Sequence, residues 1–266
     1  MGFLHILAHP ITIAASDGAR IAYHTSGQAP PSVLMVHGWM TSSRVWDALL
    51  AELAEAPIGV VTFDLRGAGG SSRGLGPLSL ARFAADARAV ADHAGLGRFH
   101  LVGHSMGGQI AQLVAAEEPG RVRSLALLNP VPLGGLPLPE GVARSFRGAG
   151  GKRADFDAIF SAAYRELQPR DRALLIEETL DIAPEVIAET FDTWSQGLAG
   201  AAPTIAARAL VMATDDPFLP PQLLADAVMA RLSQASLVHL AGPGHYPQVE
   251  RPAATANRLM ELWGRP

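Results

Sequence analysis

The sequence predicts an α/β fold, in which a mostly parallel sheet is covered by helices on both faces and carries one helical insertion. Apolar runs rich in β-branched residues alternate with segments of helical periodicity along most of the chain. These apolar runs are continuous, which is typical of strands that are buried on both faces. From Pro130 to about Pro203 the alternation stops, and helical patterns follow one another without a convincing strand.

Composition limits the classes of function. The chain has 266 residues, of which 48% are hydrophobic and 17% charged, enough for one large domain with an insertion. The net charge is -4 and the basic residues form no run, so we expect no nucleic-acid partner. There is no cysteine, which excludes disulfides and thiolate sites. The start, MGFLHILAHP, lacks the features of a signal peptide, and no apolar run would span a membrane. We therefore expect a cytoplasmic protein with no membrane association.

The amino-terminal half opens with two strands, about Ile11–Ala15 and Ala19–His24, joined by the hairpin pair Asp17-Gly18. Ser42 or Ser43 is placed to cap a helix, and Ser79 to cap another. The remaining elements predicted in this half are strands at Ser32–His37, Gly59–Leu65, Arg98–Gly103 and Ser124–Asn129, and a helix from Met106 to Glu118 that Pro119 ends.

The carboxyl-terminal half begins with the insertion. Three helical patterns are predicted there, at 156–167, at 170–182 and from Pro184 onward, and the glycine-rich stretch Arg147–Lys152 is expected to be flexible. The sheet then resumes, with strands at Arg208–Thr214 and Ser236–Leu240, a helix near Pro221 and a last helix at Gln248–Trp263. The predicted division is a core domain of residues 1–133 and 204–266 with a helical cap of residues 134–203.

The motif Gly103-His104-Ser105-Met106-Gly107 directly follows a predicted strand and directly precedes a predicted helix. A G-x-S-x-G motif in this setting is typical of a nucleophile elbow. The glycines remove side chains that would collide in so tight a turn, and they tolerate strained backbone angles. We predict that Ser105 is a nucleophile at the amino terminus of the helix.

A serine nucleophile requires a base, and histidine is the side chain whose pKa suits that role near neutral pH. His245 follows the last predicted strand, in the loop AGPGHYP. Asp215 and Asp216 close the strand before it, and one of them is expected to orient the base. In a parallel sheet, functional groups gather beyond the carboxyl ends of the strands. We predict Ser105, Asp216 and His245 as the catalytic residues, and Asp215 as a solvated loop residue.

A tetrahedral intermediate also requires two donors for its oxyanion. The backbone N–H of Met106, just after the nucleophile, is one candidate. The N–H of Trp39, in the loop after the strand that ends at His37, is the other. His37 itself is expected to form structural hydrogen bonds.

These segments resemble the α/β-hydrolase superfamily over nearly the whole chain. The resemblance is carried by HGW at His37–Trp39, DLRGAGGS at Asp64–Ser71, GHSMGG at Gly103–Gly108, ATDDPFLP at Ala213–Pro220 and GPGHYPQVERP at Gly242–Pro252. The order serine, acid, histidine matches the family. Ala213 stands where the family usually has glycine, but Asp216 and Pro220 keep the family's spacing. The resemblance implies that Asp64 and Arg66 brace loops and that the insertion forms a lid over the site.

The leading interpretation is a serine hydrolase of small carboxylic esters or lactones, with Trp39, Met106 and Trp194 contacting a small-molecule substrate in an apolar pocket. Other members of the family that the chain resembles use the same residues for different reactions. The alternatives are therefore a cofactor-free perhydrolase, a carbon–carbon bond hydrolase and a cofactor-free dioxygenase. A non-catalytic receptor is an alternative of another class. No metal or organic cofactor is expected, and a homo-oligomer is compatible with the sequence. Further candidates for the pocket wall are Met40, Phe156, Phe160, Phe191 and Phe218.

Overall fold

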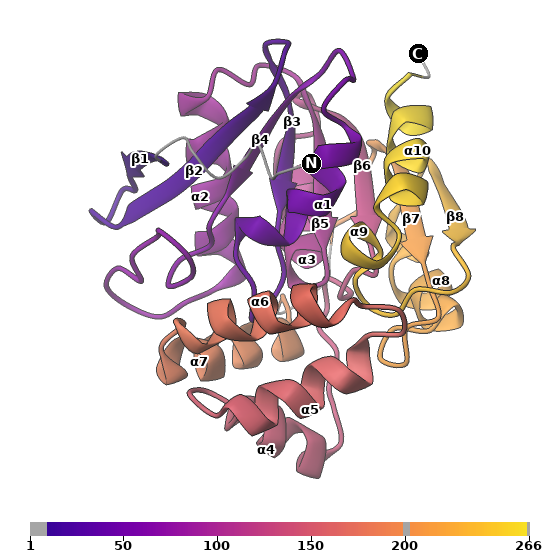
Figure 1. The fold of residues 1–266 in the computed structure, drawn as a ribbon. Helices are drawn as coiled ribbons and strands as arrows, with labels where there is room; N and C mark the ends of the chain where they lie inside the picture. Colours follow the sequence, from indigo (N-terminus) through magenta and orange to yellow (C-terminus); the bar gives the residue numbers. More distant parts are fainter. Residues whose placement is uncertain (1–9, 199–202, 265–266) are drawn as a thin grey trace.

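The computed structural model describes residues 10–198 and 203–264. In this part of the chain, eight strands form one sheet in the order β1-β2-β4-β3-β5-β6-β7-β8 (Figure 1). Strands β3 to β8 are mutually parallel, and β2 runs antiparallel to both β1 and β4. The α/β fold with a mostly parallel sheet is thus confirmed. The strands are β1 Ile11–Ala14, β2 Arg20–Gly27, β3 Pro31–Val36, β4 Gly59–Phe63, β5 Phe99–His104, β6 Val122–Leu128, β7 Arg208–Ala213 and β8 Ala235–His239.

Helices cover both faces of the sheet (Figure 1). Helices α1, α9 and α10 lie in front of it in this view, whereas α2 and α3 lie behind it and pack on each other. The helices outside the insertion are α1 Asp47–Glu52, which follows a 3-10 turn at Ser43–Trp46, α2 Leu80–His93, α3 Met106–Glu117, α8 Pro221–Ala227, α9 Pro247–Glu250 and α10 Pro252–Trp263. Ser42 and Ser79 cap their helices as predicted, each accepting a hydrogen bond from a backbone N–H.

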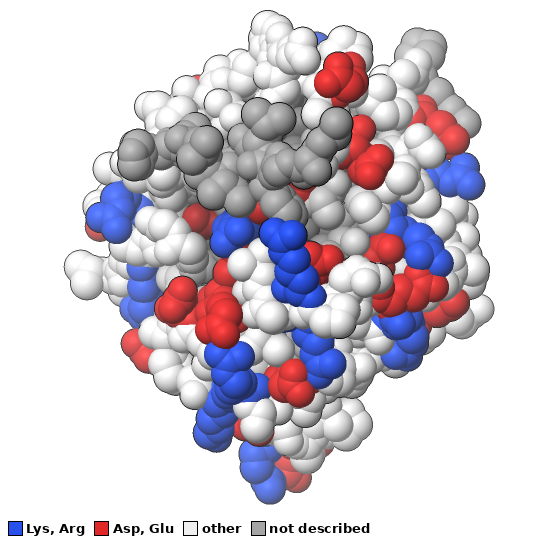
Figure 2. Space-filling model, in the orientation of Figure 1, with Lys and Arg blue, Asp and Glu red and all other residues white. Residues whose placement is uncertain are grey.

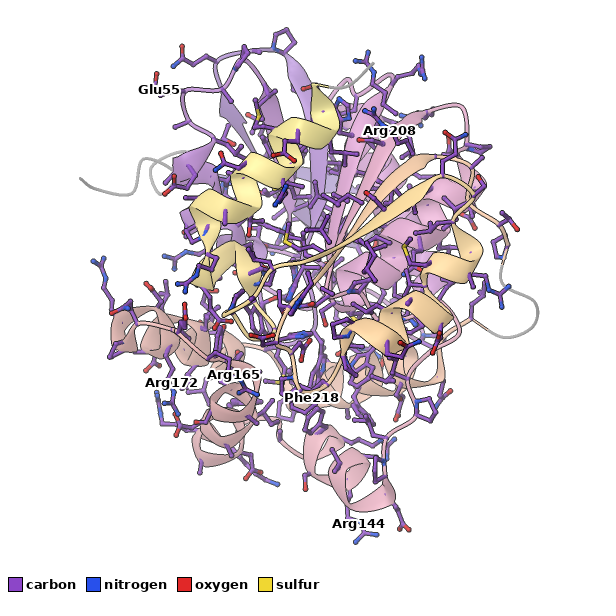
Figure 3. All side chains as sticks on the ribbon, turned by 90° about the vertical axis from the view of Figure 1, so that its right-hand side faces the viewer. Glu55, Arg144, Arg165, Arg172, Arg208 and Phe218 are labelled. Carbon is purple, nitrogen blue, oxygen red and sulfur yellow. The ribbon has the colours of Figure 1, made fainter. Side chains whose placement is uncertain are left out.

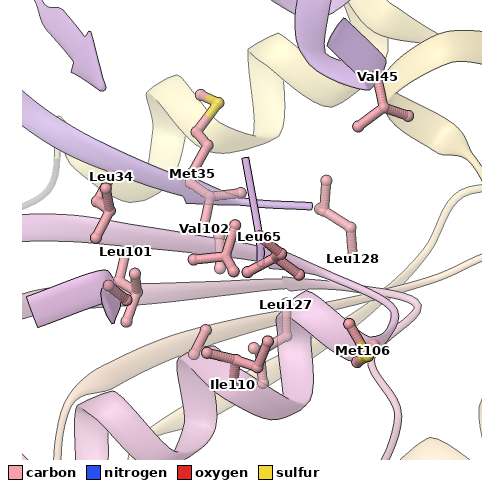
Figure 4. Packing of buried hydrophobic residues seen from close by; sticks show 14 of the residues in the cluster. Leu34, Met35, Val45, Leu65, Leu101, Val102, Met106, Ile110, Leu127 and Leu128 are labelled. Atoms are coloured by element: carbon pink, nitrogen blue, oxygen red, sulfur yellow. The ribbon is translucent and has the colours of Figure 1, made fainter. Parts of the chain in front are cut away.

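The core explains why the central strands read as continuous apolar runs. Leu34 and Met35 of β3 lie opposite Leu101 and Val102 of β5, and none of the four is exposed to solvent (Figure 4). Burying one such side chain contributes about 1.5–3 kcal/mol. The two central strands are therefore fixed in register by apolar packing, and this register sets where each strand ends.

Among the described residues between β6 and β7, four consecutive helices form a group at the end of the sheet toward which β7 and β8 point (Figure 1). They are α4 Glu140–Arg147, α5 Arg153–Ala163, α6 Pro169–Leu180 and α7 Pro184–Gln196. The sequence predicted three of them and missed α4. The predicted boundaries of the cap stay a prediction, and residues 199–202 beside one of them lie outside the described residues.

Two other expectations concern the glycine-rich stretch and the last helix. In the stretch Arg147–Lys152, Ala149 is fully buried and a Cβ on Gly150 would lie 2.5 Å from Cα of Pro184, whereas Gly148, Gly151 and Lys152 are exposed, and the expected flexibility stays a prediction. The predicted last helix is divided into α9 and α10 because Pro252 cannot continue a helix that begins before it.

The surface seen in Figure 2 carries acidic and basic side chains side by side on the described residues. No helix in the two described ranges has the length and apolarity needed to cross a bilayer. The inference that the chain starts without a signal peptide depends on residues 1–9, which lie outside the described part.

Candidate active site

Ser105 stands between β5 and α3 in a strained backbone conformation, with φ 56° and ψ -122°. A residue other than glycine in such a region costs about 1–3 kcal/mol, and the surrounding turn must compensate for it. A Cβ on Gly103 would lie 2.4 Å from the carbonyl oxygen of Gly107, and one on Gly107 would lie 2.2 Å from that of Val36. Only glycine fits these two positions, so the turn around Ser105 is as tight as a nucleophile elbow requires.

His245 and Asp216 form a short hydrogen bond. Nδ1 of His245 lies 2.6 Å from Oδ2 of Asp216, whose side chain is completely buried. The other carboxylate oxygen of Asp216 accepts a hydrogen bond from the N–H of Phe218 at 2.8 Å. Because Nδ1 donates its proton to the carboxylate, Nε2 of His245 is left as the acceptor.

Asp215 faces the other way, as predicted. Its side chain is about half exposed, pairs with His239 at 2.9 Å and accepts the N–H of Gly242 at 2.8 Å. These contacts lower the pKa of Asp215, and the hydrogen bond from the Gly242 backbone has the larger effect. The structure therefore brings Asp216, and not Asp215, to His245.

The main chain of His245 is held by two buried side chains that the sequence reasoning did not assign to the site. Nδ2 of Asn129 lies 3.1 Å from the carbonyl oxygen of His245, and Nε2 of His104 lies 2.9 Å from the same oxygen. Asn129, with φ 39°, follows β6, and His104 ends β5. A polar residue closing the apolar run SLALLN was the available signal for Asn129.

Burial lowers the pKa of His104 well below its usual value, so the ring stays neutral while Nε2 donates to His245. Burial likewise lowers the pKa of His37. Nε2 of His37 accepts the N–H of Leu65 at 2.9 Å, and Nδ1 donates to the carbonyl oxygen of Gly38 at 2.9 Å. His37 thus has the structural hydrogen bonds that were expected of it.

Asp64 and Arg66 also contact loops. The carboxylate of Asp64 accepts the N–H groups of Ser43 and Gly70, each at 2.8 Å. The guanidinium of Arg66, which is buried, bonds to both Asp17 and Asp86. Neither side chain lines the pocket described below.

The two backbone amides proposed for the oxyanion face no acceptor of their own. In the described part of the chain, neither the N–H of Trp39 nor that of Met106 donates a hydrogen bond. Met106 is the first residue of α3, where such N–H groups are free and the helix dipole favours negative charge. A Cβ on Gly38 would lie only 3.0 Å from Cβ of Ser105. The absence of a side chain at Gly38 therefore lets this loop approach the serine.

Ser105 and His245 line one and the same pocket. Its volume is about 60 Å³, several times the roughly 10–15 Å³ that one water requires. Apart from these two residues, its wall is aliphatic and aromatic: Trp39, Met40, Val131, Leu136, Leu138, Phe146, Ile159, Ala163, Trp194, Phe218, Leu219 and Tyr246. Figure 3 shows Phe218 where helices α4–α7 meet the rest of the molecule.

The wall agrees only in part with the predicted one. Trp39 and Trp194 line the pocket, with their rings 5.8 Å apart, and Nε1 of Trp39 donates to the carbonyl oxygen of Ile187 at 3.0 Å. The side chain of Met106 does not line it; it is 2% exposed and packs in the core near Ile110 (Figure 4). The helix turns this side chain inward, and the predicted contact of Met106 with a substrate stays a prediction.

Three other predicted wall residues are behind the pocket. Phe156 and Phe160 are fully buried within the helical segment, and Phe191 packs against Trp39 at 5.9 Å. Sequence reasoning missed Phe146, which lies on the unpredicted helix α4 and stacks on Trp39 at 5.5 Å.

No group of three or more side chains suited to bind a metal occurs within residues 10–198 and 203–264. In the same ranges, no hydrogen bond joins the hydroxyl of Ser105 to the imidazole of His245. Hydrogen bonds of this kind are often long without substrate and tighten when it binds. The arrangement thus brings a serine and an imidazole that is hydrogen-bonded to a buried carboxylate to one apolar pocket.

Comparison with known proteins gives the family. Residues 33–258 match the model of the alpha/beta hydrolase family. A protein named as a candidate carbamate hydrolase of Variovorax paradoxus is 30% identical over 91% of this chain and 96% of its own length. A non-heme haloperoxidase of Rhodococcus erythropolis is 39% identical over 45% of this chain, and that match spans 44% of the relative.

Partial matches of this kind recur, since the chain spans less than half the length of several curated relatives that it matches. Among solved structures, the enol-lactonase of Burkholderia xenovorans superposes with a TM-score of 0.83 at 21% identity, covering 96% of this chain and 100% of the other. That likeness shows the fold. Because the family model covers most of the sequence, the chain belongs to the alpha/beta hydrolase family.

Proposed function

We propose that this protein hydrolyses small, uncharged carboxylic esters or lactones through an acyl-enzyme on Ser105. The observation that carries the proposal is the pocket itself. It is lined by a strained serine at the start of a helix and by a histidine whose Nδ1 lies 2.6 Å from a buried carboxylate. A serine hydroxyl becomes a useful nucleophile only when such a base removes its proton.

In the acylation step, Oγ of Ser105 attacks the carbonyl carbon while Nε2 of His245 takes the hydroxyl proton. The carbonyl oxygen gains the electron pair and is held by the N–H groups of Trp39 and Met106. The imidazolium is stabilised by Asp216. As the carbon–oxygen bond of the leaving group breaks, His245 returns the proton to the departing alcohol.

In the deacylation step, water takes the place of the alcohol. His245 removes a proton from this water, the resulting hydroxide attacks the acyl carbon, and the same two amides hold the second oxyanion. Collapse of the intermediate breaks the bond to Oγ, which recovers its proton from His245. Each oxyanion donor of this kind typically contributes about 2.7–4 kcal/mol to transition-state stabilisation.

The pocket wall supports the choice of an uncharged substrate. Apart from His245, none of the residues that line the pocket is ionisable except Tyr246, and burial raises the pKa of that phenol above its usual value. A substrate carboxylate would lose its hydration here without a cation to replace it. We therefore expect neutral aliphatic acyl groups to be preferred.

Perhydrolysis is a second candidate, and the partial similarity to a non-heme haloperoxidase favours it. In that reaction, hydrogen peroxide replaces water as the nucleophile toward the acyl-enzyme. The similarity to a protein named as a candidate carbamate hydrolase makes carbamates a third acyl class to test. Ester hydrolysis and perhydrolysis share one acyl-enzyme and differ in the second nucleophile, water or hydrogen peroxide. A carbamate would instead leave a carbamoyl group on Ser105, so it is distinguished by the group that is transferred.

The test is a panel of p-nitrophenyl acetate, butyrate and octanoate, a hemisuccinate ester, a γ-lactone and a p-nitrophenyl carbamate. We expect turnover of the neutral short esters or the lactone, and a kcat/KM at least tenfold lower for the hemisuccinate. Ser105→Ala should lose about 10³-fold or more in kcat. Ser236→Ala removes an exposed hydroxyl on β8 and is the matched control.

Retention of most ester activity by Ser105→Ala would exclude the mechanism. Binding of the panel compounds without turnover by the wild-type protein would instead support a receptor. Peracid formation from acetate and peroxide at a higher rate than ester hydrolysis would make perhydrolysis the main reaction.

A further inference from the structure

Glu250, the last residue of α9, is a buried carboxylate that binds four backbone amides. Oε2 accepts the N–H groups of Arg165 at 2.8 Å, Glu166 at 2.9 Å and Gly244 at 3.0 Å. Oε1 accepts the N–H of Tyr246 at 3.3 Å. The first two amides belong to the connection between α5 and α6, and the other two flank His245. One side chain thus joins the helical segment to the loop of the candidate base.

The same two stretches touch at other points. The N–H of His245 donates to the carbonyl oxygen of Ala163 at 2.8 Å. A Cβ on Gly244 would lie 2.1 Å from that oxygen, so the two backbones are in direct contact. The rings of Tyr164 and Tyr246 stack with their centroids 4.5 Å apart. Figure 3 labels Arg165 at this junction, below the sheet.

Hydrogen bonds to a carboxylate are roughly twice as strong as those between neutral groups, and three amides share one oxygen here. Glu250 does not line the pocket, so it cannot touch a substrate there. What its carboxylate fixes is the path of the main chain on both sides of His245. A displacement of about 1 Å in a reacting group is enough to reduce a rate by roughly 10²-fold.

We propose that Glu250 is a positioning residue, which sets the imidazole of His245 by fastening residues 244–246 to the α5–α6 connection. The effect on turnover rests on the proposed function. The effect on the geometry of His245 and Asp216 does not, and it is measured in the resting protein.

Two substitutions separate the placement of the oxygen from its charge. Glu250→Gln keeps one oxygen within reach of the three amides, and we expect kcat to fall no more than tenfold. Glu250→Asp keeps the charge but shortens the side chain by one methylene, and we expect kcat to fall about 10²-fold with KM changed less than threefold. Arg251→Gln, which breaks only the partly exposed ion pair with Glu166, is the matched control and should stay within twofold of wild type.

The second measurement is the far-downfield proton resonance expected for the hydrogen bond between Nδ1 of His245 and Asp216. It should persist in wild type, Glu250→Gln and Arg251→Gln, and should broaden or vanish in folded Glu250→Asp, with circular dichroism as the control for folding. If Glu250→Asp does not fold, the Glu250→Gln variant alone tests the proposal. A folded Gln variant that loses the resonance or more than a hundredfold in kcat overturns the proposal, and one that keeps both supports it.

A folded Glu250→Asp protein with the wild-type resonance and kcat also overturns it. Should the wild-type protein hydrolyse none of the panel compounds, the proposed function fails, yet the resonance still decides the role of Glu250.

Discussion

Replacing Asp216 by asparagine tests the candidate base most directly. In the structure, one carboxylate oxygen accepts the proton on Nδ1 of His245 at 2.6 Å and the other accepts the N–H of Phe218 at 2.8 Å. An asparagine amide that keeps its oxygen on Phe218 turns its NH₂ group toward Nδ1. Nδ1 must then act as the acceptor, which places the imidazole proton on Nε2, where it blocks proton transfer from Ser105.

The magnitude follows from two terms. In the opposite amide orientation, the asparagine oxygen accepts the proton on Nδ1 and Nε2 is again the acceptor. The NH₂ group then faces the N–H of Phe218, and leaving this donor without an acceptor costs about 1–3 kcal/mol. The neutral amide also no longer stabilises the imidazolium. Two unit charges about 4 Å apart interact by about 4 kcal/mol at an effective dielectric constant of 20. Since 1.36 kcal/mol corresponds to tenfold in rate, the expected loss in kcat is about 10³–10⁵-fold.

The assay is the steady-state hydrolysis of the best neutral ester of the panel, with kcat and KM measured separately for wild type, Asp216→Asn and Asp215→Asn. Asp215→Asn is the matched control, because the same change is made one residue away in a side chain that pairs at the surface with His239. It should change kcat less than threefold. If Asp216→Asn kept more than a tenth of the wild-type kcat, or if both variants lost activity equally, the assigned orientation of His245 would be wrong.

Two further predictions follow from other contacts. Gly38→Ala should lower kcat by about 10–100-fold while leaving the circular dichroism unchanged, because its Cβ would lie 3.0 Å from Cβ of Ser105 and must displace the loop of the Trp39 amide; unchanged turnover would show that this loop is not part of the site. Burial lowers the pKa of His100 to about 4, below that of a histidine in an unfolded chain, so the unfolded state binds the additional proton between roughly pH 6.5 and 4. Stability is therefore lost as the pH falls through this window. The free energy of unfolding is measured in urea at pH 7 and pH 4.5, and His100→Gln should reduce its loss between the two by about 1–2 kcal/mol, allowing for partial exposure. An equal loss in both proteins would contradict the burial effect.

The sheet was predictable because its elements are defined locally. The runs SVLMVH and RALVMAT are continuous and apolar, and the Asp17-Gly18 hairpin follows from turn chemistry, with Gly18 at φ 81°. Ser105, Asp216 and His245 were predicted together because each lies at or beyond the carboxyl end of such a run, with His245 in the loop that follows β8. Parallel strands deliver whatever follows them to the same edge, so sequence order alone indicates proximity.

The helical segment was less predictable because its contacts are not local. Helix α4 has no fully buried residue, and its side chain Phe146 packs on the rings of Trp39, Phe191 and Phe218, which are all remote in sequence. Met106 shows the same limit from the other side. An apolar residue beside a nucleophile resembles a pocket wall, but the first turn of α3 directs it into the core. Which way such residues point is decided by tertiary packing, which the local pattern does not contain.

The arrangement of strands also explains why the loop of His245 needs so many attachments. In the sheet, β8 is separated from β5 by β7 and β6, and strands lie about 4.8 Å apart, so the loop must cross roughly 14 Å to reach Ser105. The stretch from Leu240 to His245 is long enough, since six extended residues span about 20 Å.

An irregular loop of this length would sample many conformations unless each step were held. The structure provides a contact at the end of each strand in turn. The carbonyl oxygen of Pro243 accepts the N–H of Asp215 after β7, and the carbonyl oxygen of His245 accepts hydrogen bonds from Asn129 after β6 and from His104 at the end of β5. Glu250 holds the same loop from the side of the helical segment. The position of the imidazole is thus set by the succession of strand ends beneath the loop, and a deletion within residues 240–244 should abolish activity even where the sheet still folds.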